Sequence, residues 1–108
     1  AVRDWASGVV TVTTIEPVGI VVIEGVCALH RTLRDAYALR IWLEVEADVR
    51  LARAVARDGE SARSMWLETW MPREERYAGI DDPVACADAV LDGDGRLLRT
   101  PTGSSLGA

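Results

Sequence analysis

The sequence predicts an α/β domain in which helices flank a parallel β-sheet. One observation is the run from Gly19 to Gly25, whose centre, Ile20 to Ile23, is aliphatic without any polar alternation. Such a run is typical of a strand that is buried on both faces, as in parallel sheets. The other is that two further strand-like runs, residues 40–45 and 89–91, are separated by helical patterns.

Length and composition indicate a small soluble protein with one core. The chain has 108 residues, of which 49% are hydrophobic and 27% are charged. Its 12 basic and 17 acidic residues give a net charge of -5, which argues against a nucleic-acid partner. No apolar run approaches the roughly 20 residues that span a bilayer, and the two cysteines follow no signal sequence. We therefore expect a cytoplasmic protein without a membrane partner.

The segments around the apolar run predict short elements. Residues 9–15 alternate valine or isoleucine with threonine and predict an edge strand with one wet face. Residues 16–19 contain a proline and a glycine and predict a turn. Residues 26–39 suit one or two turns of helix. Residues 40–45 are rich in branched and aromatic side chains and predict a second strand.

The helix predicted from Asp48 to Asp58 has an arginine stripe. At 100° per residue, Arg50, Arg53 and Arg57 fall within about 60° of one another. The apolar residues expected on the opposite side are Leu51, Ala52, Val55 and Ala56. Guanidinium groups hold phosphate oxygens through paired hydrogen bonds, so the stripe suits a polyphosphate. The alternative is a solvated face whose arginines pair with nearby acids.

The second half of the chain predicts another helix, from Glu60 to about Tyr77, with a kink at Pro72. Trp66, Trp70 and Tyr77 recur at helical spacing, which is more typical of core packing than of base stacking. Residues 81–83 predict a stop, and residues 84–87 a short turn. Residues 94–108 are rich in Gly, Ser, Thr and Pro and predict a hairpin remnant and a flexible tail.

Glu24 is the first candidate for chemistry because it follows the predicted inner strand. Open α/β sheets bind ligands at the carboxyl ends of their strands, and Gly25 allows a sharp exit there. An acid after one strand and an arginine helix after the next could supply a magnesium ligand and phosphate clamps to one nucleotide. His30 has no acid or nucleophile at a recognisable spacing and is expected at or near the surface.

The order of several motifs resembles a known family. They are Asp4-Trp5, the run Val21 to Val26, Arg50 to Gly59, Trp66 to Tyr77, and Ala87 to Gly93. Together they resemble the C-terminal part of uridine kinase-like P-loop kinases, especially the form common in high-GC bacteria. The resemblance implies that residues 1–93 are the C-terminal portion of a P-loop NTPase fold, with residues 94–108 as a tail. It also implies transfer of the γ-phosphate of ATP to the 5′-hydroxyl of uridine or cytidine.

The same resemblance implies roles for individual residues. Glu24 matches an acid that helps to hold Mg²⁺. The helix from residue 48 to 58 matches the start of a lid over the ATP phosphates, with Arg53 and Arg57, and then Arg50, as the phosphate-binding candidates. Asp4 and Trp5 are the nucleoside-binding candidates. The sequence departs from the family at Arg3, where a tyrosine is usual, and at Ala54, where a further arginine is usual.

One family motif is missing from the sequence. No Gly-x-x-x-x-Gly-Lys-Ser/Thr (Walker A) loop occurs, and the chain has no lysine. In such kinases the strand that bears this loop lies between those matching residues 20–23 and 41–45. The two strands could come together, a second copy or a complementing chain could fill the gap, or the sequence could be a fragment. We expect no activity from this chain alone; the alternative is a noncatalytic interaction or regulatory module derived from a kinase fold.

Overall fold

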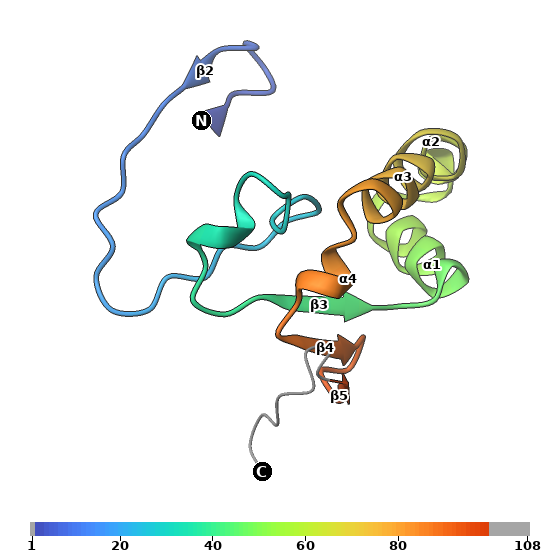
Figure 1. Ribbon diagram of the computed structural model, residues 1–108. Coiled ribbons are helices and arrows are strands. Elements are labelled where there is room, and N and C mark those ends of the chain that lie inside the picture. The colour runs from blue at the N-terminus through green and yellow to red at the C-terminus, as the bar shows by residue number, and fades with distance from the viewer. Residues whose placement is uncertain (1, 100–108) are drawn as a thin grey trace.

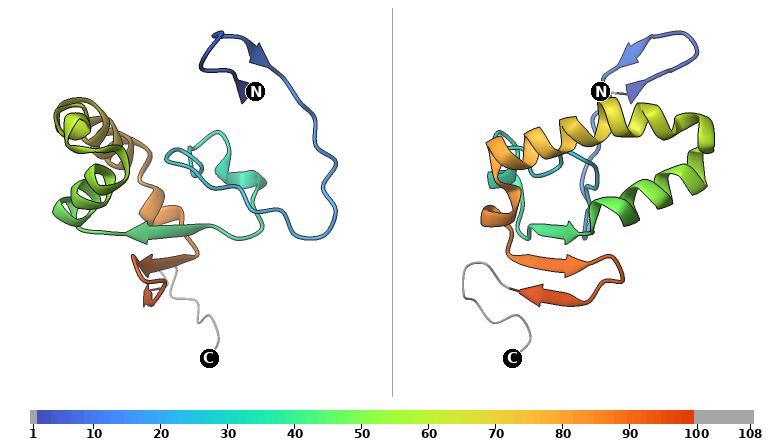
Figure 2. Two further views of the ribbon diagram at one scale, coloured as in Figure 1. Left: turned by 180° about the vertical axis from the view of Figure 1, so that it is seen from behind. Right: turned by 90° about the vertical axis from the view of Figure 1, so that its right-hand side faces the viewer.

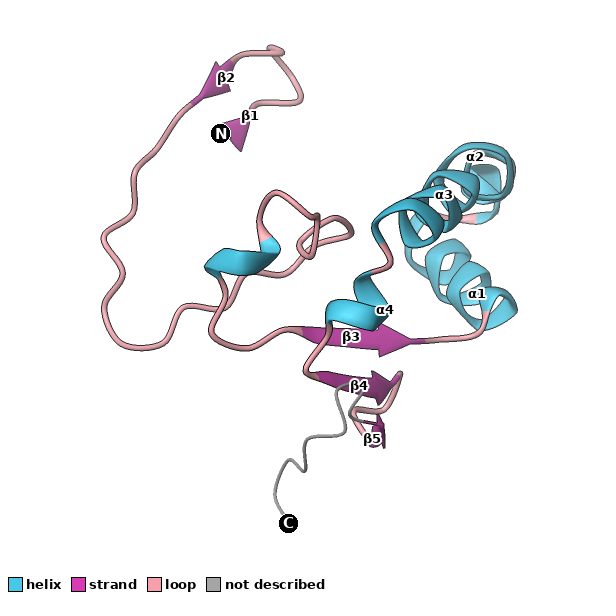
Figure 3. Ribbon diagram, in the orientation of Figure 1, coloured by secondary structure: helices cyan, strands magenta, loops and turns pink. Residues whose placement is uncertain are grey.

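The computed structural model describes residues 2–99, which form a small α/β arrangement (Figures 1 and 3). The strands are β1 (Val2–Arg3), β2 (Val10–Thr11), β3 (Ile41–Glu44), β4 (Ala89–Asp92) and β5 (Leu97–Arg99). The α-helices are α1 (Ala47–Asp58), α2 (Arg63–Met65), α3 (Met71–Asp81) and α4 (Pro83–Cys86). Two 3₁₀ turns, η1 (Arg34–Ala36) and η2 (Glu60–Ala62), and a π-helical segment, η3 (Trp66–Trp70), complete the set.

The main sheet is mixed rather than wholly parallel. β3 and β4 are parallel, with Ile41 opposite Ala89 and Glu44 opposite Asp92, and the chain between them contains α1 to α4. β5 pairs antiparallel with β4, so the order is β3-β4-β5. Antiparallel pairing follows from the short β4–β5 connection, because a parallel partner needs a crossover of a dozen or more residues. The α/β class is confirmed, whereas the expectation of a purely parallel sheet is wrong.

The core lies where the central strand β4 meets the helices. Val90 is 1% exposed and Ala87 is fully buried. The other buried apolar residues are Leu29, Ala54, Val55, Met71 and Ala89. Figure 2 shows α1 running beside the long helical segment of residues 63–81, and the two are in contact through α2 and η3. Strand β4 therefore anchors the packing, as the apolar run at residues 89–91 predicted.

The predicted inner strand from Gly19 to Gly25 is not formed. Ile20 is 94% exposed and Val22 is 82% exposed, and the segment follows an extended path away from the sheet (Figure 1). No backbone hydrogen bond within the described chain involves residues 12–24. A strand buried on both faces needs paired neighbours and a covering layer on each face. The described chain supplies neither, so the expected burial is wrong. The strand predicted at residues 20–23 therefore does not pair with the one at residues 41–45.

The flanking segments are also less regular than expected. Within residues 9–15, only Val10–Thr11 pairs, antiparallel to β1. Residues 26–39 form successive turns and the single 3₁₀ turn η1 instead of an α-helix. A short helix needs a packed apolar face to offset the cost of nucleation, and here Leu29 is buried while Leu33 is 48% exposed.

The helical segment continues through Pro72 with a π-helical turn immediately before it. Met71 donates its N–H to the carbonyl of Trp66, which is a bond over five residues. Proline has no N–H, and its ring crowds the carbonyl four residues earlier, at Glu68. The wider π turn relieves this conflict, so the irregularity expected at Pro72 takes this form.

The helical segment ends where predicted. Asp81 is the last residue of α3, and Asp82 adopts left-handed backbone angles with a φ of 46°. The Asp82 side chain then accepts a hydrogen bond from the N–H of Ala85, which caps α4. No helix among residues 2–99 is long and apolar enough to cross a membrane. Cys27 and Cys86 are both free thiols.

A pair of equivalent substitutions tests this assignment of core and surface. Val90→Ala should lower the free energy of unfolding by about 2 kcal/mol, because it leaves a cavity in the core. Val22→Ala should change it by less than about 0.5 kcal/mol, because the side chain is 82% exposed. Urea denaturation followed by circular dichroism measures both. A cost for Val22→Ala equal to that for Val90→Ala would mean that residues 20–23 are buried after all.

Candidate functional site

The three arginines of the predicted stripe line one cavity. This arginine cavity has a volume of about 380 Å³. Its walls are formed by Val45, Arg50, Arg53, Ala54, Arg57, Trp66, Met71 and Glu74. Helix α1 supplies the arginines, and the segment of residues 66–74 supplies the opposite wall. The helical spacing thus brings the three guanidinium groups to one place, as expected.

The cavity lies at the carboxyl ends of the two parallel strands. Val45 directly follows β3, and Gly93 directly follows β4. A Cβ atom added to Gly93 would lie 3.0 Å from Nη1 of Arg53 and 3.2 Å from Cγ2 of Val45. The Arg53 guanidinium therefore lies close to Gly93, and a side chain at this position would crowd Arg53 and Val45. Ligands of α/β sheets bind at this end of the strands.

Two of the arginines are paired with acids, and the third is not. Arg50 Nη1 lies 2.8 Å from Glu74 Oε2. Arg57 donates through Nε and Nη2 to the two carboxylate oxygens of Asp58, at 2.9 and 3.1 Å. Within residues 2–99, the Arg53 side chain makes no hydrogen bond or ion pair. Arg53 is thus the arginine with donors available to an added anion.

Asp58 joins the arginine stripe to a tryptophan. Its Oδ2 also accepts a hydrogen bond of 2.9 Å from the indole Nε1 of Trp66. The hydrogen bonds from Arg57 and then from Trp66 lower the pKa of Asp58, and the bond to Asp58 raises the pKa of Arg57. The Arg57 guanidinium lies 5.6 Å from the Trp66 ring centroid. The two charges and the indole therefore form one connected group at the end of α1.

The apolar side of α1 differs from the expected one. Ala54 and Val55 are buried, whereas Ala52 and Ala56 are exposed. Ala54 lies at the edge of the arginine stripe and lines the same cavity, so this side of the helix faces the segment of residues 63–74 as well as solvent. The alternative of a solvated face whose arginines pair with acids fits Arg57, which is 68% exposed and bound to Asp58. Arg50 is also paired with an acid, Glu74, although its side chain is only 35% exposed.

The other candidate residues lie apart from the arginine cavity. Glu24 is exposed in the extended segment, and neither it nor Asp4 nor Trp5 lines the cavity. Asp4 and Trp5 lie in the turn between β1 and β2, where Asp4 accepts a hydrogen bond from the N–H of Ala6. Because residues 20–23 form no strand, Glu24 is not held at a sheet edge as the sequence suggested. The described residues contain no cluster of three or more His, Cys, Asp or Glu side chains suited to a metal ion.

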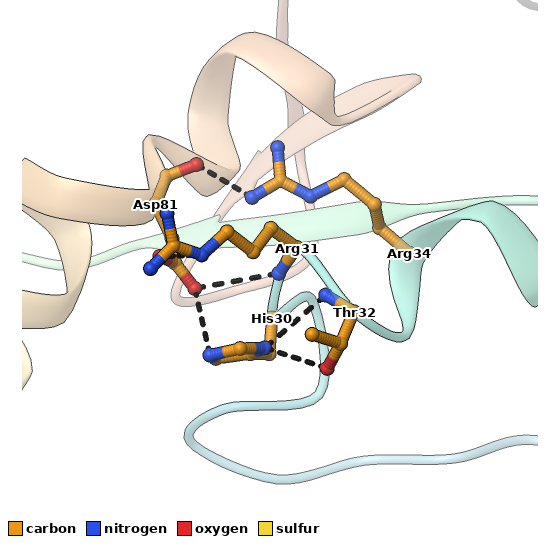
Figure 4. Close-up of polar contacts among 5 residues, drawn as sticks. All are labelled: His30, Arg31, Thr32, Arg34 and Asp81. Atoms are coloured by element: carbon orange, nitrogen blue, oxygen red, sulfur yellow. Dashed lines mark hydrogen bonds and ion pairs between the residues drawn. The ribbon is translucent and has the colours of Figure 1, made fainter.

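A second polar cluster centres on the buried Asp81 (Figure 4). The Asp81 side chain is 4% exposed, and its carboxylate lies 3.4 Å from Nε2 of His30 and accepts a hydrogen bond from the N–H of Arg31. On the other side of the ring, Nδ1 accepts a hydrogen bond from the N–H of Thr32 and lies 2.8 Å from its hydroxyl oxygen. Arg34 donates to the backbone carbonyl of Asp81 at 2.5 Å.

This cluster attaches the irregular segment of residues 27–37 to the end of α3. His30 thus has an acidic partner, which the sequence does not reveal because Asp81 lies 51 residues further along the chain, where its pattern predicts only a helix stop. No local spacing could have found it, since the contact exists only after α3 packs against the segment. These contacts satisfy the buried carboxylate of Asp81, which is typical of a structural connection, while Nε of Arg34 is buried without a hydrogen-bond partner.

Comparison with known proteins finds similarity to uridine kinases over most of the chain. It is 34% identical over 85 residues to a uridine kinase of Halobacterium salinarum, which covers 71% of this chain and 37% of that protein. It is 29% identical over 84 residues to a uridine kinase of Staphylococcus epidermidis, and this match covers 70% of this chain and 40% of that protein. The chain is uridine kinase-like. A uridine kinase of Staphylococcus haemolyticus is 40% identical over 52 residues, 46% of this chain and 25% of that protein.

The uridine kinase-like chain spans well under half of these relatives. The matches to the first two proteins cover 37% and 40% of their lengths, which fits a partial, C-terminal kinase segment. No protein-family model matches the chain. No solved structure matches it either.

Acidification should break the contact between Asp58 and Trp66. The pKa of Asp58 is held below its ordinary value of 3.8, so the contact stabilises the fold above that value and is lost as the pH falls through the lowered pKa. The indole N–H resonance of Trp66, followed by NMR from neutral to strongly acidic pH, should shift with a midpoint below 3.8. In Asp58→Asn this transition should disappear. A midpoint at or above the ordinary value would contradict the assigned contact.

Proposed function

We propose that this chain supplies the phosphate-binding lid of an ATP-dependent nucleoside 5′-phosphotransferase of the uridine kinase type, with a P-loop NTPase fold. The observation that carries the proposal is the convergence of Arg50, Arg53 and Arg57 on one cavity at the carboxyl ends of β3 and β4. The names of the relatives support a nucleoside such as uridine as the phosphate acceptor.

The arginines have separate roles in this proposal. Arg53 binds phosphate oxygens directly, since its donors are not used by any described acid. Arg50 and Arg57 exchange their carboxylate partners, Glu74 and Asp58, for phosphate when the nucleotide binds. Fixed guanidinium groups neutralise the charge that spreads over a transferred phosphoryl group, which is the main contribution a protein makes to this reaction.

ATP fits the arginine cavity better than Mg²⁺ fits the described residues. A cavity lined by three guanidinium groups has the charge and the donors for a polyphosphate. A protein magnesium site is built from oxygen ligands, and residues 2–99 gather no three acids or other metal-binding side chains in one place. Glu24 remains a single proposed ligand, which would need phosphate oxygens or groups of another polypeptide beside it.

The remaining kinase parts are proposed to come from a complementing polypeptide or a longer form of the chain. No lysine or Walker A loop occurs in the sequence, and the first two relatives are covered over only 37% and 40% of their lengths. β3 pairs with β4 alone among the described strands, and the apolar residues 20–23 pair with nothing. These unpaired groups suit an added strand, which fits the proposal of an incomplete sheet.

The exposed apolar segment also supports the second candidate, a noncatalytic interaction module. Val18, Ile20 and Val22 are each more than 80% exposed, and such an apolar stretch is a typical protein-binding surface. The module would bind its partner through this segment without any phosphate chemistry. Phosphate binding at Arg53 is the property that separates the two candidates, because only the kinase proposal requires it.

Arg53→Ala should weaken the binding of tripolyphosphate by about 10- to 100-fold, as expected for the loss of about 1.5–3 kcal/mol of charged hydrogen bonds. Isothermal titration calorimetry measures the affinity. Arg76→Ala is the matched control, because Arg76 is exposed on α3 and does not line the cavity. Equal affinities for Arg53→Ala and the original chain would exclude Arg53 from the phosphate site and favour the interaction module.

The purified chain mixed with Mg²⁺, ATP and uridine or cytidine should form no nucleoside monophosphate above background. The physical reason is that no lysine-bearing loop is present to hold the β- and γ-phosphates. Chromatographic separation of radiolabelled product gives the measurement, with a full-length uridine kinase as the positive control. Turnover by this chain alone would refute the need for a complementing polypeptide.

A further inference from the structure

We propose that two copies of this chain associate by exchanging a strand, in which the apolar run of residues 20–23 of each copy pairs with the free edge of β3 in the other. The proposal names a second copy of the chain as the partner of the exposed apolar segment, and it does not depend on phosphate binding at Arg53. A complementing polypeptide that adds a strand at the same edge would replace the exchanged run. The exchange therefore describes the chain in the absence of such a polypeptide.

The apolar run has the composition of a strand but no strand partner. Residues 20–23 are Ile-Val-Val-Ile, and such β-branched residues favour pleated strands. Each of the four is more than half exposed, from 55% for Val21 to 94% for Ile20. Within the described chain, their backbone N–H and C=O groups make no hydrogen bonds to other backbone groups. An extended apolar segment of this kind is a template for pairing with another chain.

Strand β3 offers a matching edge. It pairs only with β4 among the described strands, so its other edge carries unpaired backbone groups. Ile41 and Leu43, whose side chains lie on one face of the strand, are 44% and 59% exposed. β3 and the apolar run are both four residues long. The length, the free edge and the exposed apolar side chains of β3 therefore all suit the run.

The run lies apart from the β3 edge of its own copy. The turns that follow it, in residues 27–37, are attached to the end of α3 through the contacts of His30 and Arg31 with Asp81. Leu29 in these turns is also buried. The run precedes these contacts and leads away from the sheet (Figures 1 and 2). A second copy can bring its β3 edge to the run by rigid-body association, and mutual exchange of an identical element gives a closed two-fold dimer.

Charge favours antiparallel pairing in the exchange. In an antiparallel register over the four residues of each strand, Glu24 of one copy comes opposite Arg40 of the other, and opposite charges in such a cross-strand pair are stabilising. In a parallel register, Glu24 instead lies at the end of β3 that carries Glu44, which is already opposite Asp92. Like charges on neighbouring strands are destabilising, so we expect the antiparallel register.

The mass of the chain in solution tests the exchange. In sedimentation equilibrium the concentrated chain should have the mass of two copies, and dilution should return it to single copies with the exposed run described above. Val22→Glu should weaken the dimer by about 100-fold, because it places a carboxylate without a partner in the added strand. Val12→Glu is the matched control and should leave the dimer unchanged, since Val12 is 81% and Val22 82% exposed but only Val22 lies in the run. A single-copy mass at every concentration, or equal dimerisation of Val22→Glu and the original chain, would overturn the proposal.

Hydrogen exchange locates the contact between the copies. The backbone amides of residues 20–23 have no backbone partners in one copy, so in the dimer they should exchange more slowly, and dilution or Val22→Glu should remove this protection. Mass spectrometry of peptic fragments gives the measurement. A dimer in which these amides exchange freely would mean that the copies join elsewhere. Protection in a single-copy species would mean that the run pairs within its own chain, and either result would exclude the exchange.

Disulfide cross-linking tests the direction of the added strand. In a background with Cys27→Ser and Cys86→Ser, a chain carrying Glu24→Cys is mixed with a chain carrying Arg40→Cys and oxidised. Antiparallel pairing should give a linked pair on a non-reducing gel. A chain carrying Glu44→Cys, used in place of the one carrying Arg40→Cys, is the control and should link far less. A link to position 44 but not to position 40 would contradict the antiparallel register.

The exchange and the phosphate site can fail separately. Tripolyphosphate binding that depends on Arg53, together with a single-copy mass, would leave the phosphate site standing and exclude the exchange. A dimer that is lost in Val22→Glu, without tripolyphosphate binding that depends on Arg53, would support the exchange and favour the interaction module.

Discussion

The β3–β4 pair, the only parallel pair among the described strands, is the constraint that places the arginine cavity. Parallel pairing of β3 with β4 brings the residues that follow them, Val45 and Gly93, to the same edge of the sheet. Helix α1 begins directly after β3, so its first turns pass over this edge and set Arg53 against a residue without a side chain. The arginine cavity therefore lies at this edge, between α1 and the segment of residues 66–74.

The cavity walls combine two kinds of surface on a short stretch of chain. One wall is α1 with its guanidinium groups, and the other is the segment of residues 62–74 with its tryptophans. Two acids connect the walls: Glu74 binds Arg50 of α1, and Asp58 at the end of α1 accepts a hydrogen bond from the indole of Trp66. These ion pairs are partly exposed, so in the proposed phosphate site the acids could be exchanged for phosphate at modest cost.

The N-terminal segment has little regular structure. Residues 12–24 are extended and make no backbone hydrogen bonds within the described chain, and their branched side chains face solvent. The chain re-enters the packed region through Leu29 and the cluster of His30 and Arg31 around Asp81. Coverage of 37% of the length of the Halobacterium salinarum relative agrees with this picture of a partial kinase-like unit.

The sequence by itself determined the elements whose pattern is local. Strands at residues 41–44 and 89–92 follow from local composition, helix α1 and its arginine stripe follow from helical spacing, and the resemblance to uridine kinases follows from the order of motifs. The exposure of residues 20–23 could not be predicted. An apolar run indicates that a segment suits a buried strand, but it does not show whether partner strands are present. Likewise, only tertiary packing decided that Arg53 meets Gly93, that Asp81 binds His30, and that Trp66 and Trp70 line a cavity. Each of these contacts joins residues whose proximity depends on how helices and strands pack, which no local spacing encodes.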